Sequence, residues 1–128
     1  MKAYRAAILR FDAQQQAAFD KDGLLVVAAD ASGIERILAV GDHDTLIGQY
    51  AGVPLEHLPG RIIAPGFVDM HVHFPQIDVI GSPASGLLPW LENYTFPQEA
   101  RFSDAAHSAD AAGFFLTELV RNGVTTAL

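Results

Sequence analysis

The chain has 128 residues, 50% of them hydrophobic, which is enough apolar mass for one modest domain core. Its formal net charge of −7, from 8 Lys+Arg against 15 Asp+Glu, argues against the basic face of a nucleic-acid-binding protein, and no run approaches the roughly 18 apolar residues of a membrane span. With no Cys, a metal must be held by His and carboxylates, and the lack of Cys and of a signal-peptide core is compatible with a cytoplasmic location.

Residues 1–64 are predicted to form a β-rich flanking segment. Strands are expected at four places: residues 2–11, 24–28, 34–40 and 61–64. Turns are expected at residues 20–23 and 30–33, the second closing a β-hairpin, and residues 45–50 are expected to form one helical turn. This pattern indicates a small β meander that flanks a functional site.

The next stretch carries a His-x-His pair between a Pro-Gly turn and a Phe-Pro step. It reads Ala64-Pro65-Gly66-Phe67-Val68-Asp69-Met70-His71-Val72-His73-Phe74-Pro75-Gln76. On an extended strand, Asp69, His71 and His73 point to the same face. Two imidazoles about 6.5–7 Å apart on one face can close on a single ion, which makes His71 and His73 candidate metal ligands. A bare His-x-His is also typical of two strand histidines bonded to backbone carbonyls.

The segment after this motif is predicted to be largely irregular. Residues 81–86 have the composition of a loop, and residues 87–97, which are rich in aromatics and bounded by prolines, suit a packed loop or lid. Packing is expected for three aromatic side chains: Trp90, Tyr94 and Phe96. A solvated position is expected for three carboxylates and three histidines: Asp78, Glu92, Glu99, His43, His57 and His107.

The clearest helix signal lies over residues 103–123. Ser103 can cap its start, and Gly123 occupies the place of a left-handed residue after its end. An apolar stripe is expected to face the core: Ala105, Ala109, Ala112, Leu116, Leu119 and Val120. Residues 124–128 begin another strand, which completes a strand–helix–strand unit with parallel strands.

This order is that of the opening of a β/α barrel, and a full barrel takes roughly 250 residues. We therefore expect the sequence to be the N-terminal piece of a longer protein, and the isolated chain to be poorly soluble or partly molten.

The motif at residues 65–73 resembles the metal-dependent amidohydrolase superfamily, and Arg121-Asn122-Gly123-Val124-Thr125-Thr126 resembles its entry into the second barrel strand. Within it, His73-Phe74-Pro75-Gln76 and residues 88–99 resemble the guanine deaminase family. The resemblance implies an α/β fold. Residues 1–64 would form a β-rich (composite sandwich) segment. Residues 65–128 would form the first strand, helix and second-strand start of a TIM-like (β/α)8 metal-dependent hydrolase barrel, incomplete in this chain.

The resemblance also implies an aminohydrolase that converts guanine to xanthine and ammonia, with one Zn²⁺ per site. His71 and His73 would be its first two ligands, and iron would also suit them. His73, Phe74, Pro75 and Gln76 would bind the purine; the Gln76 carboxamide offers a donor and an acceptor side by side. The family's other ligands and proton-shuttling Glu lie on later strands, so no catalytic residue is assigned here and the 128 residues alone are expected to be inactive.

Two alternatives stay open at this point. One is another aminohydrolase of the same superfamily, acting on a different purine, a pyrimidine or a triazine. The other is a non-catalytic β/βαβ module. For the intact protein we expect a small-molecule purine substrate and a homodimer, because an aromatic segment such as residues 87–97 suits a dimer interface.

Overall fold

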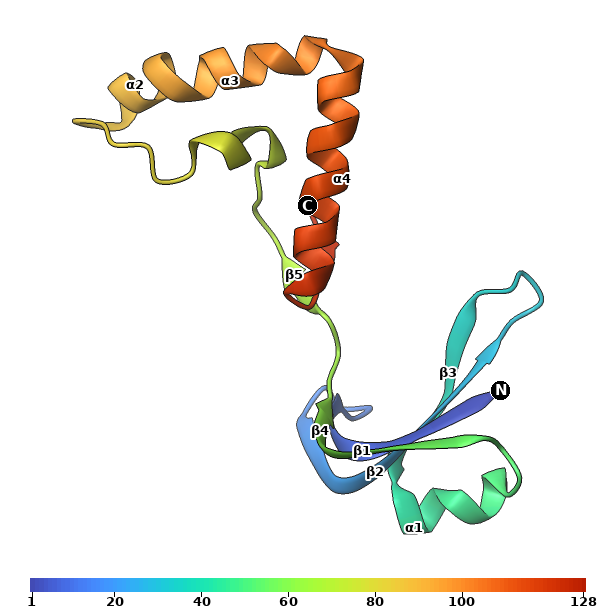
Figure 1. Cartoon of the computed structure of the whole chain (residues 1–128). Helices are drawn as coiled ribbons and strands as arrows, with labels where there is room; N and C mark the ends of the chain where they lie inside the picture. Colours follow the sequence, from blue (N-terminus) through green and yellow to red (C-terminus); the bar gives the residue numbers. More distant parts are fainter. The chain divides into compact units, whose positions relative to one another are not determined.

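The computed structural model describes all 128 residues, which divide into two compact units, Met1–Pro65 and Gly66–Leu128 (Figure 1). The first unit contains β1 (Lys2–Phe11), β2 (Ala17–Ala29), β3 (Glu35–Asp42), α1 (His43–Leu46), η1 (Ile47–Tyr50) and β4 (Leu55–Ile63). The second contains β5 (Phe67–Asp69), η2 (Phe74–Val79), α2 (Leu87–Trp90), η3 (Leu91–Thr95), α3 (Phe96–Ala100), η4 (Arg101–Ser103), α4 (Ala105–Arg121) and β6 (Val124–Ala127). None of the helices combines the length and the apolarity needed to cross a membrane.

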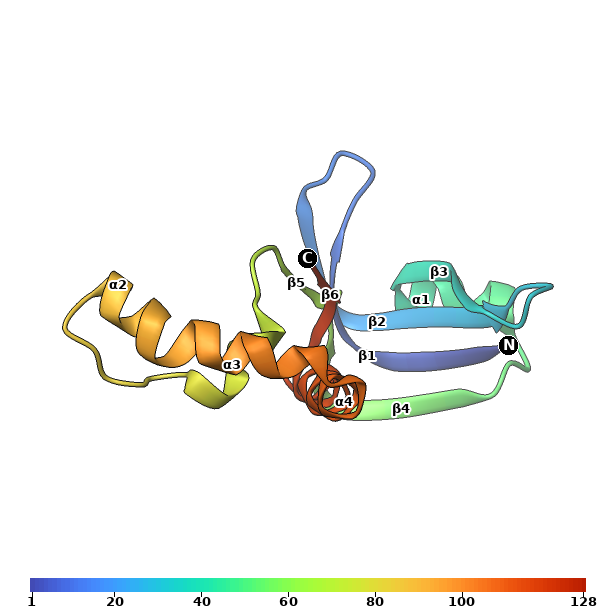
Figure 2. The ribbon, with the colours of Figure 1, turned by 90° about the horizontal axis from the view of Figure 1, so that it is seen from above.

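The first unit is built on one four-stranded sheet in the order β3-β2-β1-β4 (Figure 2). The pairs β1–β2 and β2–β3 are antiparallel, as a meander requires, and the predicted hairpin is confirmed. The prediction of a meander is wrong for β4, which pairs parallel to β1. The physical reason is the crossover through α1 and η1, since a parallel neighbour needs a longer connection than a hairpin turn.

Strand β2 is longer than predicted, and the turn expected at residues 20–23 is wrong because these residues lie inside the strand. Their two aspartates have cross-strand partners on β1. Arg5 Nε donates to Asp22 Oδ1 at 2.7 Å, and Arg10 Nε donates to Asp20 Oδ2 at 2.7 Å. The register places each arginine diagonal to its aspartate, and such cross-strand pairs of opposite charge stabilise a strand whose composition by itself favours a turn.

The turn between β1 and β2 lies instead at residues 12–16. The Asp12 carboxylate accepts hydrogen bonds from the backbone N–H groups of Gln14 and Gln16, at 2.9 and 2.8 Å. Gln15 adopts the left-handed conformation with φ of 62°. An aspartate that bonds the backbone two residues on is a common way of closing such a turn.

The core of the first unit lies between the sheet and α1–η1. Leu24 and Val26 are fully buried, and Ala3 is their neighbour on the same face. Five partly buried apolar residues pack on them: Ala39, Leu46, Ile47, Tyr50 and Val53. The helical turn predicted at residues 45–50 is confirmed and begins two residues earlier, at His43. His43 is buried because α1 brings it against the sheet, which corrects its predicted surface position. Its Nδ1 lies 2.8 Å from Oδ1 of Asp44, the next residue of α1.

In the second unit, β5 and β6 form a parallel pair joined through α4, so the predicted strand–helix–strand unit is confirmed. The pairing register shifts between Phe67 and Val68, which leaves Thr125 of β6 without a partner residue. The unit is a mixed α/β arrangement with a two-stranded sheet, and no closed barrel is present.

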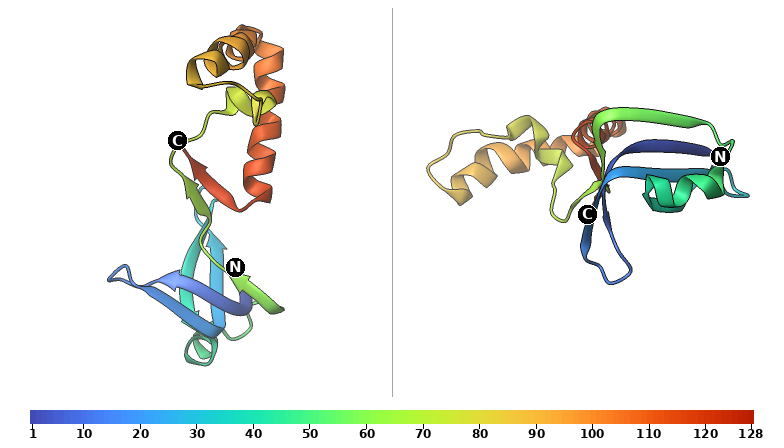
Figure 3. Two further views of the ribbon diagram at one scale, coloured as in Figure 1. Left: turned by 90° about the vertical axis from the view of Figure 1, so that its left-hand side faces the viewer. Right: turned by 90° about the horizontal axis from the view of Figure 1, so that it is seen from below.

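The loop predicted for residues 87–97 is wrong, because residues 87–103 are helical throughout and lead towards α4 (Figure 3). Pro89 lies in the first turn, where a missing N–H costs no intrahelical bond. Pro97 follows the π-type turn η3, in which the Phe96 N–H donates to the Leu91 carbonyl. This wider turn accommodates a proline that would otherwise clash with the preceding turn. Trp90 and Tyr94 are half-buried as predicted, whereas Phe96 is 56% exposed and the prediction that it packs is wrong.

The predicted helix over residues 103–123 is confirmed as α4, with Gly123 at φ of +79° after its end. Its cap is Asp104 rather than Ser103. The Asp104 carboxylate accepts the N–H groups of Ala106 and His107, at 2.8 and 3.0 Å, and these two bonds lower the pKa of that carboxyl. Donors aimed at a carboxylate favour its charged form.

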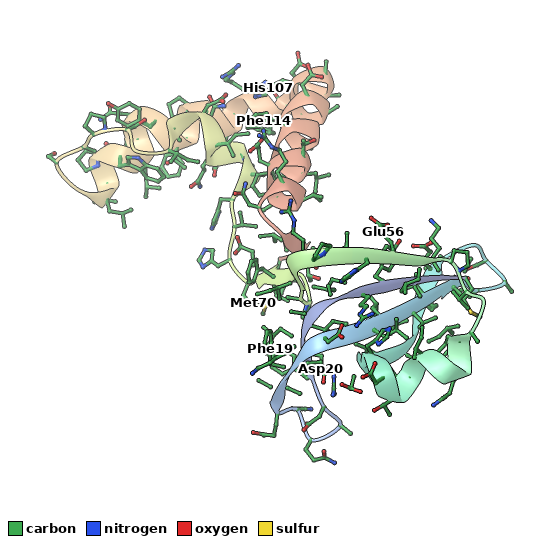
Figure 4. The ribbon with its side chains drawn as sticks, turned by 60° about the horizontal axis from the view of Figure 1, so that its bottom comes forward. Phe19, Asp20, Glu56, Met70, His107 and Phe114 are labelled. Atoms are coloured by element: carbon green, nitrogen blue, oxygen red, sulfur yellow. The ribbon has the colours of Figure 1, made fainter.

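The face of α4 that packs differs from the predicted stripe. Leu116 and Val120 are 59% and 69% exposed, and Ala105 and Ala109 are exposed as well. The packed face includes Phe115 and His107, which contact aromatic rings from η2 and η4. His107 therefore is half-buried, not solvated as predicted, whereas Phe114 next to this face is exposed (Figure 4). The segments that dock on α4, and not the stripe itself, decide which side is covered.

Candidate functional site

The two motif histidines lie just beyond the carboxyl end of β5. The strand ends at Asp69, so the prediction of a strand running through His73 is wrong. The Asp69 carboxylate accepts the N–H of His71 at 3.1 Å, which turns the chain out of the extended conformation. The helical segment η2 then begins at Phe74, with Pro75 in its first turn. A strict alternation of side chains therefore does not hold across residues 69–73.

The two imidazoles nevertheless converge. His71 Nε2 lies 2.7 Å from His73 Nε2, and the ring centroids are 4.8 Å apart. At this distance one ring donates its N–H to the other, and both rings are exposed at the surface of the unit. In a tetrahedral zinc site with Zn–N bonds of 2.0–2.1 Å, two nitrogens lie about 3.3 Å apart. The pair therefore fits two ligands of such a site after a small opening of the rings.

The pair has no third ligand in this chain. No group of three or more His, Cys, Asp or Glu side chains gathers anywhere in the structure. Zinc sites in proteins use three or four protein ligands. The residues present supply two of the ligands that a zinc site needs, because two imidazole nitrogens lie within 2.7 Å of each other.

The rest of the motif is anchored to the helices of the same unit. The Phe74 ring packs edge-on against Phe102 at 5.4 Å between centroids, and it lies 5.9 Å from Phe115 of α4. Pro75 occupies the first turn of η2, where its fixed φ suits the helix start. These contacts hold η2 against α4, and so they hold the residue that follows, Gln76, at a defined place.

Gln76 is bonded to the helical segment that the sequence prediction treated as a lid. Its Nε2 donates to Glu99 Oε1 of α3 at 2.9 Å. In the reverse direction, Gln98 Nε2 of α3 donates to Asp78 Oδ2 of η2 at 2.8 Å. Arg101 completes the set, donating to Gln98 Oε1 at 2.8 Å and lying 3.5 Å from Asp78.

Glu99 is half-buried, which corrects its predicted solvated position. Asp78, Glu92 and His57 are exposed as predicted, although Asp78 also bonds Gln98. Glu99 and Gln98 are the residues near the site that sequence reasoning missed. They could have been found only by predicting residues 87–103 as helical, because this places Gln98 and Glu99 near η2. The loop prediction did not allow that inference.

The sequence profile of the amidohydrolase family matches residues 62–128. Guanine deaminase of Escherichia coli K12 is 46% identical over 69 residues, which cover 54% of this chain and 16% of that protein. A probable guanine deaminase of Deinococcus radiodurans is 38% identical over 141 residues, which cover 100% of this chain and 30% of that protein.

A solved structure of E. coli guanine deaminase superimposes on the whole chain with a TM-score of 0.85 and 31% identity, and 31% of that protein is covered. The chain therefore spans about 30% of the length of the D. radiodurans protein and of the E. coli structure, and corresponds to their N-terminal part.

Proposed function

Because the chain belongs to the amidohydrolase family, we propose that it is the N-terminal part of a zinc-dependent guanine deaminase, which hydrolyses guanine to xanthine and ammonia. The observation that carries this proposal is the meeting of the His71 and His73 Nε2 atoms beyond β5, with Gln76 three residues further on. The similarity to guanine deaminases over the full length of the chain supports guanine as the substrate.

The proposed fold of the intact protein is a TIM-like (β/α)8 barrel. In it, β5, α4 and β6 are the first strand, first helix and second strand, and residues 1–64 form the flanking β-rich segment. Parallel pairing of β5 and β6 supports this arrangement. Active sites of such barrels lie at the carboxyl ends of the strands, which is where His71 and His73 follow β5.

In the proposed site, the imidazoles of His71 and His73 would hold one Zn²⁺ together with ligands from the rest of the barrel. The chemistry supplied there would be that of a Lewis acid, which makes water nucleophilic at neutral pH. Both histidines must be neutral to present their nitrogens, and Gln76 binds and orients the purine through its carboxamide. Phe74 keeps Gln76 in place by packing on Phe102 and Phe115, and Pro75 does so by fixing the first turn of η2.

The experiment uses the longer protein that contains this chain. It measures release of ammonia and formation of xanthine from guanine, together with bound zinc. His71→Ala and His73→Ala are each expected to lower kcat/KM by at least about 100-fold, because even the groups that orient a metal ligand are worth 10–100-fold. His57→Ala, at an exposed position outside the motif, is the matched control. Guanine turnover that survives both substitutions and chelation contradicts the proposal.

The rival within the same family is an aminohydrolase of another purine, a pyrimidine or a triazine, since the histidine pair alone does not select a base. A substrate profile of the longer protein separates the two: guanine must have the highest kcat/KM.

We also propose a homodimer, which sedimentation equilibrium of that protein tests directly.

A further inference from the structure

The carboxamide of Gln76 is held in one orientation by Glu99. A carboxylate oxygen only accepts hydrogen bonds, so the 2.9 Å contact must be made by the Gln76 Nε2–H. The Oε1 of Gln76 has no hydrogen-bond partner in the protein. The amide therefore uses a donor internally and keeps its acceptor for a ligand.

The position of Glu99 is itself fixed by its neighbour in sequence. Gln98 is 7% exposed and bonds Asp78 on η2, while its own Oε1 accepts from Arg101. Two amide–carboxylate bonds of opposite direction thus connect η2 and α3, Gln76 to Glu99 and Gln98 to Asp78. With α3 held in this way, rotating the Gln76 amide by 180° would set its oxygen against the Glu99 carboxylate, which is repulsive.

We infer that Glu99 is a positioning residue for substrate recognition, which fixes the Gln76 amide so that its oxygen is the atom offered to the base. A fixed acceptor favours an edge that carries ring N–H or amino donors and disfavours a carbonyl edge. An amide free to rotate would accept both. This inference rests on the proposed function, because it assigns the selectivity of the same site.

The test uses three variants of the longer protein with guanine as substrate. Glu99→Gln keeps the shape but removes the obligate acceptor, so the Gln76 amide can turn. The exchanged pair, Gln76→Glu with Glu99→Gln, restores one donor–acceptor bond and still offers an oxygen to the base. Glu92→Gln, at an exposed position of the same helical run, is the matched control.

Glu99→Gln is expected to raise KM for guanine about tenfold, which is the size of one lost hydrogen bond between the base and the Gln76 oxygen. The value of kcat is expected to change by less than about twofold. The exchanged pair is expected to return KM to within about threefold of the unmodified protein. Bound zinc and the melting temperature are recorded for each variant, since a purely structural role of Glu99 would lower stability in the exchanged pair without restoring KM.

An unchanged KM in Glu99→Gln overturns the inference, and so does an exchanged pair whose KM for guanine is no lower than that of Glu99→Gln. If Glu99→Gln fails to fold, the exchanged pair decides alone, by whether its KM lies near that of the unmodified protein. An unmodified protein that does not turn over guanine overturns the proposed function, and the assignment of Glu99 falls with it. This last outcome is distinguished from the others because it appears before any substitution is made.

Discussion

Gly66 precedes β5 and lies against the side chain of Thr125 on β6. A Cβ atom added at Gly66 would lie 2.7 Å from the Thr125 Cβ and closer still to its Oγ1 and Cγ2. Ordinary van der Waals contacts between carbon atoms lie at about 3.5–4 Å. Gly66→Ala therefore requires Thr125, a branched residue on the backbone of a strand, to move away by about 1 Å.

The destabilisation expected for Gly66→Ala follows from the extent of its clash with Thr125. Adding a methyl group to a packed site commonly destabilises by about 1–3 kcal/mol. The upper end is expected here, about 2–3 kcal/mol, because the clash reaches the Thr125 Cβ and a rotamer change cannot relieve it. The β5–β6 ladder is short, with three paired positions, so separation of the two strands is the expected way of relief.

The measurement is urea unfolding followed by the fluorescence of Trp90, the only tryptophan, which lies in the same unit. Gly113→Ala is the matched control. It lies within α4, where an added Cβ meets nothing within 4 Å, and it is expected to stabilise by up to about 1 kcal/mol through helix propensity.

A second substitution, at Thr125, tests whether the clash is the cause of the destabilisation. Thr125→Gly removes the atoms that the new methyl group meets, so the double variant Gly66→Ala with Thr125→Gly is expected to recover most of the loss. A Gly66→Ala free energy of unfolding within about 0.5 kcal/mol of the unmodified chain would refute the steric account, as would a double variant less stable than Gly66→Ala alone.

Two further predictions concern the first unit. Leu24→Ala is expected to lower the free energy of unfolding by about 2–5 kcal/mol, because Leu24 is fully buried beneath α1 and η1, and chemical denaturation of this variant beside Leu55→Ala, at a 42% exposed position, checks it. Hydrogen bonds from Ser32, Arg36 and the Ile34 N–H lower the pKa of Asp30 to about 2, so the ionised carboxylate stabilises the β2–β3 turn above an unfolded pKa of about 3.9, and this stabilisation is lost as the pH falls through about 2. An NMR titration of Asp30 measures this, and a β2–β3 turn that loosens equally between pH 4 and 2 in Asp30→Asn would contradict it.

Local signals were enough for several elements. Strand β1 has the predicted bounds, and α4 was predicted because a capping residue, a long apolar repeat and Gly123 agree along one segment. The convergence of His71 and His73 was also predictable, although the strand ends before them. The two histidines are two residues apart, so their rings can meet whether the chain is extended or turned. Their convergence therefore did not depend on the strand prediction being correct.

Other features were decided by partners that are distant in sequence. Residues 20–23 have the composition of a turn, but their aspartates pair with Arg5 and Arg10 across the sheet and the segment is a strand. The exposed side of α4 is set by the rings of Phe74 and Phe102. Local composition contains no information on which surface will be covered, because burial is a property of the assembled unit.

The candidate site divides in the same way. The sequence by itself determined the pair of imidazoles and the nearby Gln76, because a metal motif is defined by ligand type and short spacing. Only the tertiary structure decided that Glu99 bonds Gln76 across 23 positions of sequence. That contact needs residues 87–103 to be helical and docked on η2, and a hydrogen bond between two segments exists only once both have been placed.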